Sequence, residues 1–492
     1  MVFSKIMGQI EHVVVLMLEN RSLDNLLGWL YEAGTPPPKR IVPPGSGAAF
    51  NGLPGGSYFN EYDGRKIPVT HGTEKAVQPL RVPRLDPHEP FEHVTVQLFG
   101  NAKGEVPNPL KSGTPAQMKG FAYDYDSVYE SWAELGEVMG AYRAAQLPAL
   151  SGLARQYAVS DHWLSSVPTQ TNPNRAFSLC GTSLGRVKNL HLSAVEKFNT
   201  KTLWNALPSD VTWGIYYQDI WEDKQCFTEY SFPQIAEARK QARSAEIATI
   251  DVFFERAQKG AMPAFSYIEP SWGYGKGLPD TFIGKQGNDY HPPTWVGPGE
   301  AFVNKVYEAL SASPQRWAKT LLFITFDEHG GTYDHADPGW GAMKPDQNSG
   351  PNGFQFDRYG VRVPTILVSP WIPAGTVFRA PAGSKQPYDH TSLIASLLKW
   401  KGVDPAASGL GKRVAVAPTF ESVLSDQKRS DVPRFVVPPG YADQGGGATD
   451  FAGAKGLPIS IIKAIVDEGG SVEEIEARLQ RYKIEHKGPN VS

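Results

Sequence analysis

Five apolar runs recur along the chain, and each is nearly continuous rather than alternating. They are HVVVLML (residues 12–18), VTWGIYY (211–217), PAFSYIE (263–269), TLLFITF (320–326) and RVPTILVS (362–369). Continuous apolar strands are typical of a sheet whose two faces are both covered, whereas apolar and polar residues alternate along the strands of a sheet with one solvent-exposed face. We therefore interpret these runs as buried strands of one central sheet.

Helical patterns lie between the strands. Residues 302–313 repeat apolar side chains at the spacing of one helix face, and Ser471 with Glu474 forms a capping box ahead of VEEIEARLQRYK. Strands that alternate with helices predict an α/β fold with a central, mostly parallel sheet flanked by helices. We expect a main domain over residues 1–440 and a helical appendage over residues 441–492.

Three long segments, 34–90, 270–300 and 335–360, are rich in proline, glycine and tyrosine. Insertions of that length without regular structure are uncommon in a compact domain, and they usually serve as binding loops or lids. We expect them to lie over the edge of the sheet that carries the functional residues.

The charge balance narrows the range of partners. The chain has 48 basic and 51 acidic side chains, a net charge of −3, which argues against a nucleic-acid partner because phosphate backbones attract strongly basic surfaces. No stretch reaches the roughly 20 apolar residues of a membrane span. The first apolar run passes directly into Glu19 and Asn20 with no small-residue cleavage site. We expect a soluble protein, either cytoplasmic or secreted without a visible signal. The sequence carries no information on its oligomeric state.

The two cysteines, Cys180 and Cys226, exclude a disulfide framework and a cysteine-based zinc site. We expect both to be ordinary buried thiols.

Polar residues directly follow two of the predicted strands. Glu19 and Asn20 come after the first run, and Asp327 and Glu328 come after the fourth. Ligands of open α/β sheets bind beyond the carboxyl ends of the strands, and carboxylate and amide oxygens suit a hard divalent cation. A single acid there could only cap a helix, but two adjacent carboxylates repel each other unless a cation lies between them.

A hydroxyl suited to act beside such a cation occurs in SSVPTQTNPNRAFSLCGTS (165–183). Thr171 stands where polar residues and Pro173 indicate a helix start. Backbone N–H groups and the helix dipole favour an anion such as phosphate at this position. A metal ion would lower the pKa of the hydroxyl and produce a nucleophile. Alone, TNPNR indicates only a helix start, and it is the combination that favours catalysis.

Five histidines complete the set of candidate residues. His88 and His93 lie in DPHEPFEHVTVQLFG, His291 in GNDYHPPTW, His335 in GGTYDHADP and His390 in QPYDHTSL. A lone histidine is most often structural, but a core role is less common in a proline-flanked insertion such as that of His291. Histidines beside a phosphoryl group donate hydrogen bonds to its oxygens or protonate the leaving oxygen.

Five segments in order, IEHVVVLMLENRSLDNLLG, SSVPTQTNPNR, NDYHPP, FDEHGGTYDHADP and YDHTSLIASLLKW, resemble the bacterial phospholipase C and acid phosphatase family of phosphoesterases. The fold of that family is similar to alkaline phosphatase. The resemblance implies one divalent metal ion, either calcium, zinc, magnesium or manganese. Its ligands would be Glu19, Asn20, Thr171, Asp327 and Glu328. It also implies that Thr171 attacks phosphorus and that water hydrolyses the resulting phosphothreonine.

The resemblance further implies that His291 and His88 contact the phosphate and act in catalysis. Substrate contacts are expected from His335, Asn174 and Arg175 as well, although His335 and His390 could instead brace the loops. Leu23 replaces the usual aromatic residue after ENRS, a packing change that should spare the ligands. Family members are commonly exported with a twin-arginine signal, and none is visible here.

The sequence thus predicts a metal-dependent phosphoric ester hydrolase of the phospholipase C type, acting on phospholipid head groups. A phosphomonoesterase active at acidic pH is the nearest alternative, because the same metal and nucleophile serve both reactions. A sulfatase or phosphomutase on this scaffold is disfavoured, since sulfatases need a nucleophile made from cysteine or serine. A non-catalytic binding protein is disfavoured because every expected ligand position is filled. Aromatic residues in segments 271–277 and 332–341 could cage a choline-like cation, but loop packing is the favoured interpretation.

Overall fold

The five apolar runs form the middle of one central sheet in a computed structural model, which describes residues 8–47, 49–129, 134–189, 197–220, 225–278, 281–445, 465 and 472–485. They are β1 (His12–Leu18), β7 (Trp213–Tyr217), β9 (Phe265–Ile268), β12 (Thr320–Phe326) and β13 (Thr365–Val368). β1 and β12 pair in parallel along all seven of their residues. The strands expected from the apolar pattern are therefore present.

Four shorter strands complete the sheet in the described part of the chain. They are β2 (Arg40–Val42), β5 (Ala158–Ser160), β8 (Ala245–Thr249) and β14 (Thr376–Phe378). The strand order is β2-β14-β5-β13-β12-β1-β9-β7-β8. β13 alone runs antiparallel to its neighbours, β12 and β5. The predicted α/β fold with a central, mostly parallel sheet is confirmed.

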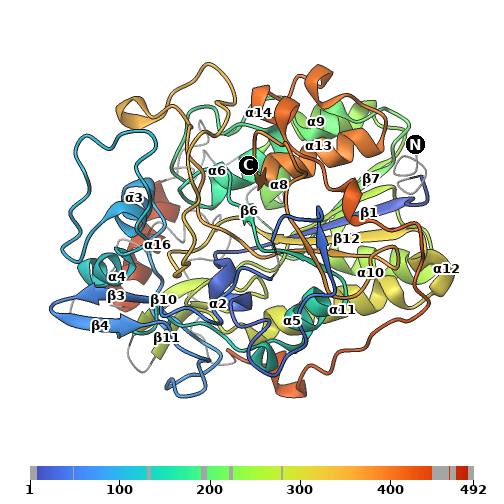
Figure 1. The fold of residues 1–492 in the computed structure, drawn as a ribbon. Coiled ribbons are helices and arrows are strands. Elements are labelled where there is room, and N and C mark those ends of the chain that lie inside the picture. The colour runs from blue at the N-terminus through green and yellow to red at the C-terminus, as the bar shows by residue number, and fades with distance from the viewer. Residues whose placement is uncertain are drawn as a thin grey trace.

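Helices cover both faces of this sheet (Figure 1). One face carries α6 (Thr171–Cys180), α7 (Leu203–Ala206), α9 (Gln234–Gln241) and α13 (His390–Trp400). The other carries α5 (Pro148–Gln156), α10 (Ile250–Lys259), α11 (Gly297–Ser311) and α12 (Pro314–Trp317). α11 starts earlier than the predicted helix at 302–313, because Pro298 is compatible with a first helical turn. Further short elements are α2 (Leu23–Leu27), β6 (Trp163–Leu164), α8 (Phe227–Ser231), β15 (Tyr388–Asp389) and α14 (Lys412–Val416).

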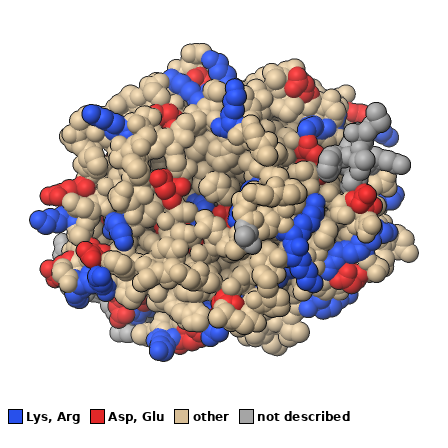
Figure 2. Space-filling view, viewed as in Figure 1, with Lys and Arg blue, Asp and Glu red and all other residues tan. Residues whose placement is uncertain are grey.

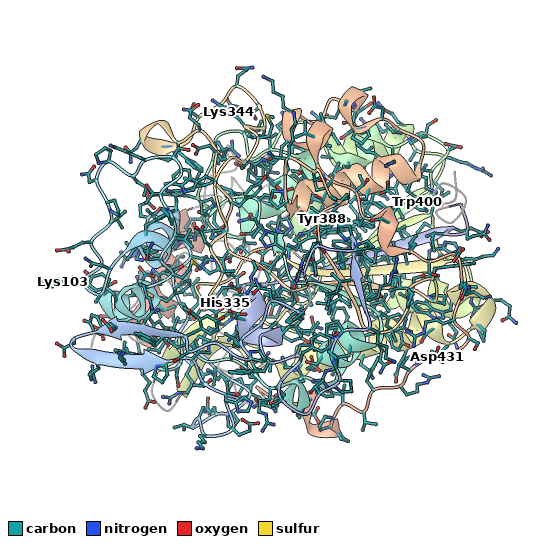
Figure 3. The ribbon with its side chains drawn as sticks, viewed as in Figure 1. Lys103, His335, Lys344, Tyr388, Trp400 and Asp431 are labelled. Atoms are coloured by element: carbon teal, nitrogen blue, oxygen red, sulfur yellow. The ribbon has the colours of Figure 1, made fainter. Side chains whose placement is uncertain are left out.

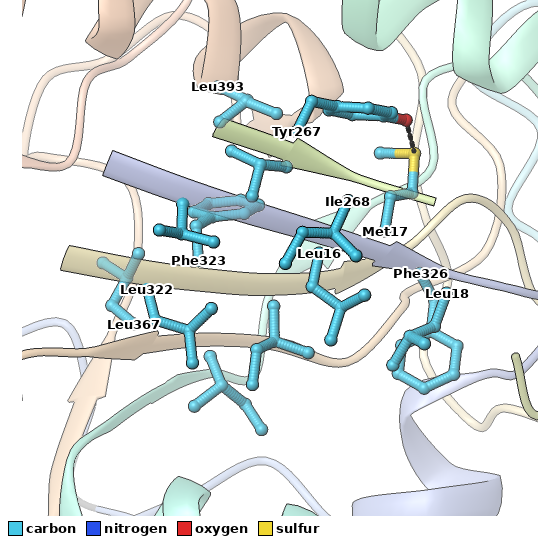
Figure 4. Packing of buried hydrophobic residues seen from close by; sticks show 14 of the residues in the cluster. Leu16, Met17, Leu18, Tyr267, Ile268, Leu322, Phe323, Phe326, Leu367 and Leu393 are labelled. Atoms are coloured by element: carbon cyan, nitrogen blue, oxygen red, sulfur yellow. Dashed lines mark hydrogen bonds between the residues drawn. The ribbon is translucent and has the colours of Figure 1, made fainter. Parts of the chain in front are cut away.

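The core lies on both faces of the central strands (Figure 4). Residues 13–18 of β1 are at most 1% exposed. Met17 and Tyr267 lie together on one face, where the tyrosine hydroxyl is 3.8 Å from the methionine sulfur. Burial of each large apolar side chain contributes roughly 1.5–3 kcal/mol, so the strand ends are held rigidly by this packing.

A second, smaller core lies beside the sheet. It is covered by α3 (Phe91–Phe99), α4 (Phe121–Tyr129) and the hairpin of β3 (Phe59–Tyr62) and β4 (Arg65–Pro68), on the left of Figure 1. We call this part the lobe. Its buried side chains include Leu98, Phe121, Tyr333 and Val361.

The three long segments differ from expectation in one respect. Segment 34–90 contains β2, β3 and β4, and segment 270–300 contains the hairpin of β10 (Tyr274–Leu278) and β11 (Thr281–Lys285). The expectation that they lack regular structure was wrong there, because these strands are short and carry no extended apolar pattern. Segment 335–360 contains only a short 3-10 turn, Pro351–Gly353.

The C-terminal helix α16 spans Val472–Glu485, as the sequence predicts, while Ser471 of the expected capping box lies outside the described residues. The division at residue 440 stays a prediction. Cys180 and Cys226 are both buried free thiols, as expected. Over the described ranges, no helix combines the length and apolar character needed to cross a bilayer.

Candidate active site

Three segments of the chain meet at Thr171, at the carboxyl edge of the sheet. Thr171 is the first residue of α6, and its hydroxyl lies 3.1 Å from Glu19 Oε2 and 3.3 Å from Asn20 Oδ1. Glu19 and Asn20 directly follow β1, and all three side chains are at most 6% exposed. Asn20 adopts a left-handed backbone with φ of 54°, a conformation that asparagine tolerates better than most residues. This turn brings the two polar side chains off the strand end toward α6.

Asp327 and Glu328 directly follow β12, the neighbour of β1. Asp327 Oδ1 accepts hydrogen bonds from the backbone N–H groups of Asn20 (3.0 Å) and Glu328 (2.8 Å). Asp327 Oδ2 is buried and has no hydrogen-bond partner within the described ranges. The Glu328 carbonyl accepts from the N–H of Arg21 at 3.0 Å. The two strand ends are therefore tied together by their own backbone.

Two glycines after Glu328 allow this close approach. Gly330 and Gly331 have φ angles of +58° and +66°. A Cβ atom on Gly330 would lie 2.1 Å from the carbonyl oxygen of Asn20, and one on Gly331 would lie 2.6 Å from Cβ of Pro87. The Gly-Gly pair is thus required both by its backbone conformation and by its neighbours.

Arg175 lies one turn beyond Thr171 and forms a buried ion pair with Glu19. Its Nε donates to Glu19 Oε1 at 2.8 Å, and its Nη2 also donates to that oxygen. The same guanidinium donates to the Tyr267 hydroxyl (3.0 Å) and the Met17 carbonyl (3.1 Å). Burial lowers the pKa of Arg175, but the charge of Glu19 and its other neighbours raise that pKa overall. Arg175 therefore stays charged and fixes the Glu19 carboxylate.

Asn174, the other predicted substrate contact on α6, faces the loop that precedes the helix. Its side-chain amide donates to the carbonyls of Val167 (3.0 Å) and Thr169 (2.8 Å) and accepts from the N–H of Val167 at 3.1 Å. These contacts hold the loop that delivers Thr171.

The NDYHPP loop is tied to the end of β1. The carbonyl of Asp289 accepts from the N–H of Glu19 at 2.8 Å, and the carbonyl of Tyr290 accepts from Arg21 Nε at 2.7 Å. Burial raises the pKa of Asp289 to about 6. His291, which follows Tyr290, is 2% exposed and is thereby held at the same edge as Glu19.

Glu300 on α11 anchors this loop from behind. It accepts a hydrogen bond from the Tyr290 hydroxyl at 2.7 Å and another from the N–H of Ala149 at the start of α5, at 2.6 Å. Burial raises the pKa of Glu300 to about 7. Tyr290 has a φ of +73°, which is unusual for a bulky residue. The anchor therefore holds the loop in a conformation that the chain would not otherwise prefer.

The hydrogen-bond role of one ring nitrogen of His291 can be assigned. Nδ1 is hydrogen-bonded to the carbonyl oxygen of Pro292, and it lies 3.9 Å from Asp86 Oδ1. Because a carbonyl only accepts, Nδ1 carries the hydrogen. The second predicted catalytic histidine, His88, has its ring 4.9 Å from that of His93, and its carbonyl oxygen would lie 2.9 Å from a Cβ on Gly331. The segment that carries His88 is thus packed on the Gly-Gly turn.

A group of potential metal ligands surrounds His335, which Figure 3 labels near α2. Ligand atoms of Asp24, Asp334 and His335 all lie within 4.8 Å of one another. Arg362 donates to Asp334 Oδ1 (2.9 Å) and Asp24 Oδ1 (3.0 Å). His335 Nδ1 is 2.6 Å from Asp24 Oδ2, and its Nε2 is 3.1 Å from Asn51 Oδ1. Side chains of the kind that bind a divalent metal are present here, but Arg362 already supplies positive charge to both carboxylates.

His390 starts α13 and is completely buried. Its Nε2 lies 2.6 Å from the carbonyl oxygen of Asp327, and its Nδ1 lies 3.4 Å from Trp163 Nε1. Both ring nitrogens are used by protein groups, and burial lowers the pKa of His390. These contacts brace the chain at Asp327.

Sequence reasoning missed several residues of this edge. Arg21 and Asp24 lie between two apolar runs, and Arg362 lies just before a strand. Charged residues beside such apolar runs were a signal that could have identified them. Glu300 gave none, because a glutamate in a helical pattern is usually exposed.

Comparisons with known proteins identify the family of this chain. Residues 10–404 match the model of the Phosphoesterase family. Non-specific phospholipase C6 of Arabidopsis thaliana is 36% identical over 434 residues, which cover 86% of the chain and 74% of that protein. Non-specific phospholipase C1 of the same plant is 35% identical, with 87% and 74% covered. Non-hemolytic phospholipase C of Pseudomonas aeruginosa is 24% identical, with 80% and 54% covered.

A solved structure of a protein in the alkaline phosphatase superfamily from Vibrio parahaemolyticus is 14% identical and aligns with a TM-score of 0.31. It covers 57% of this chain and 66% of that one.

Proposed function

Because this chain belongs to the phosphoesterase family, we propose that it is a metal-dependent hydrolase of the phospholipase C type, which cleaves phosphodiesters of phospholipid head groups through Thr171. The observation that carries the proposal is the position of the Thr171 hydroxyl, 3.1 Å from Glu19 and 3.3 Å from Asn20 at the N-terminus of α6. A hydroxyl in this position lies beside oxygen atoms that suit a cation and at a helix end that favours an anion, which is the combination that a phosphoryl-transfer nucleophile needs.

The residues at this edge suit a divalent cation. Asp327 Oδ2 is a buried carboxylate oxygen without a hydrogen-bond partner in the described chain, and an unpartnered buried charge is costly unless a cation neutralises it. The proposed donors are all oxygens, which suit a hard ion. They are Glu19, Asn20, Thr171, Asp327 and Glu328. When bound, the ion would supply positive charge that lowers the pKa of the Thr171 hydroxyl.

Thr171 is oriented for attack by its neighbours. Its hydroxyl hydrogen is directed at Glu19 Oε2 or Asn20 Oδ1, so that the oxygen lone pairs are available to phosphorus. Arg175 keeps the Glu19 carboxylate in place from the opposite side. The N-terminus of α6 favours the negative charge of the phosphate.

The reaction then proceeds in two displacements. Thr171 gives up its hydroxyl proton as a bond forms between its Oγ1 and phosphorus and the bond from phosphorus to the glycerol oxygen breaks, and that oxygen takes up a proton and leaves as an alcohol. Water next attacks the phosphothreonine and the bond between Thr171 Oγ1 and phosphorus breaks, which releases the head-group phosphate and restores the Thr171 hydroxyl. We assign the phosphate contacts and the proton transfer to His291 and His88, which are held near the Glu19 end of β1 and on the Gly-Gly turn.

Substitution of Thr171 tests this proposal. Thr171→Ala should lower kcat by at least about 1,000-fold, whereas Thr171→Ser should retain a measurable fraction because it keeps a hydroxyl. Both variants are assayed with phosphatidylcholine, sphingomyelin and p-nitrophenyl phosphate, before and after chelation and metal add-back. A near wild-type rate for Thr171→Ala with an intact circular dichroism spectrum would remove Thr171 from the mechanism. A preference for the monoester would favour the phosphomonoesterase alternative.

A further inference from the structure

A cavity of about 300 Å³ lies at the amino end of the sheet, opposite the edge that holds Thr171. It is lined by residues from the end of α5 and from just before β14, and by five residues of the segment before β2: Tyr31, Thr35, Pro36, Pro37, Lys39, Arg155, Gln156, Ala374 and Gly375. Backbone hydrogen bonds fix its rim: the N–H of Gly375 donates to the Arg155 carbonyl at 2.8 Å, and the N–H of Lys39 donates to the Gly375 carbonyl at 2.9 Å. The cavity, which we call the Arg155 pocket, is therefore a preformed feature.

Two cations in the Arg155 pocket lack acidic partners. Nε and Nη2 of Arg155 donate to the Leu30 carbonyl at 2.9 and 2.5 Å, while no acceptor for Nη1 exists among the described residues. Neither Arg155 nor Lys39 has a described carboxylate within 4.0 Å. Glu32, the acid that acts electrostatically on Arg155, is bonded instead to His71 at 2.7 Å. Arg155 and Lys39 thus form no ion pair with a described carboxylate, and Glu32 acts on Arg155 only from a longer distance.

A third donor in the pocket is a buried phenol. The hydroxyl oxygen of Tyr31 is buried and has no hydrogen-bond partner in the described ranges. Burial raises the pKa of Tyr31 to about 12, so the group remains a protonated donor at physiological pH. Buried polar atoms without partners are uncommon in native proteins, and each costs about 1–3 kcal/mol. A ligand that accepts from this hydroxyl would remove that cost.

We propose that the Arg155 pocket is a second anion site, which binds a phosphate group through Arg155 Nη1, the Lys39 ammonium and the Tyr31 hydroxyl. The three donors come from separate chain segments that line one cavity, and a phosphate group has enough oxygen acceptors to bond to all three. The amino end of the sheet lies on the right of Figure 1, and Figure 2 shows basic side chains on the right of the same face with acidic ones between them. The phosphate is either free or part of a lipid head group.

Calorimetric titration of inorganic phosphate into the full-length, chelator-treated protein tests the site. Wild type should bind phosphate. Lys39→Gln should weaken binding about tenfold or more, because it removes one charged hydrogen bond, and Tyr31→Phe should weaken it about fivefold. Lys103→Gln is the matched control, since Lys103 (labelled in Figure 3) is exposed, is not among the residues that line the pocket, and gives an equal change in net charge. Lys39 is exposed, so its substitution should leave the fold and the turnover of phosphodiester unchanged.

A second arm identifies the source of the phosphate. The same variants are sedimented with phosphatidylcholine vesicles that contain or lack phosphatidic acid. If Lys39→Gln reduces recovery with phosphatidic acid vesicles relative to Lys103→Gln, and phosphate competes, the ligand is a lipid head group. If phosphate binds in the calorimeter but the vesicles do not recruit the protein, the ligand is free phosphate. If neither probe binds, or if Lys39→Gln and Tyr31→Phe behave like Lys103→Gln, the site does not exist.

Discussion

Replacement of Arg175 by methionine should lower the free energy of unfolding by about 3–5 kcal/mol, because it leaves the carboxylate of Glu19 buried without its cation. The side chains of Arg175 and Glu19 are 0% and 2% exposed, so water cannot take the place of the guanidinium. The substitution also removes donors to the Tyr267 hydroxyl and the Met17 carbonyl. Each of those losses contributes about 1 kcal/mol more if the acceptor stays dry.

Urea denaturation followed by circular dichroism measures this cost. Arg256→Met is the matched control, because Arg256 pairs with Glu246 where the two side chains are 37% and 29% exposed. That pair should be worth about 1 kcal/mol or less. The double variant Glu19→Gln/Arg175→Met should be more stable than the sum of the two single changes predicts, since neither charge is then left alone. Equal costs for Arg175→Met and Arg256→Met would refute the reasoning from burial.

Three further changes test other parts of the edge. Asp327→Asn should lower the divalent metal content measured by elemental analysis after dialysis, and an unchanged content would remove Asp327 from the ligand set. Burial raises the pKa of Glu300 from 4.5 to about 7, so the unfolded chain loses this proton first and stability should fall by about 3 kcal/mol as pH rises through that window. Glu300→Gln should flatten that fall in urea denaturation at pH 5 and pH 8, and an unaltered slope would contradict the assignment. Gly330→Ala should destabilise the protein and abolish turnover, since its Cβ would lie 2.1 Å from the Asn20 carbonyl; normal activity would show that this turn adapts.

Much of the sheet edge that holds Glu19 and Asp327 could be predicted because its residues directly follow long apolar strands. β1 and β12 have seven apolar-rich residues each, which is long enough to be recognised as buried strands in the sequence. Because they are parallel neighbours, they end at the same edge of the sheet. The positions of Glu19 and Asp327 follow from that geometry alone. Thr171 could be placed at a helix start by its own local signals, whereas its meeting with the residues after β1 was implied by the family resemblance and not by any local pattern.

Other features depend on contacts that no local pattern encodes. β5 and β14 have three residues each, too few to show a period. The apolar run of β13 indicates a buried strand but not its antiparallel direction. Glu300 is read as a surface residue in a helix until the tertiary structure places Tyr290 and the start of α5 against it.

The lobe has its own hydrophobic interior, separate from that of the sheet. Residues of that interior such as Leu98 belong to a cluster apart from the strands, whereas Phe121 contacts the ring of His329, which directly follows Glu328. The lobe nevertheless supplies the chain that carries His88 and the packing behind Tyr333. We therefore expect sequence variation in this interior to change substrate preference while the hydrolytic reaction persists. Evolution could then alter substrate preference separately from the reaction.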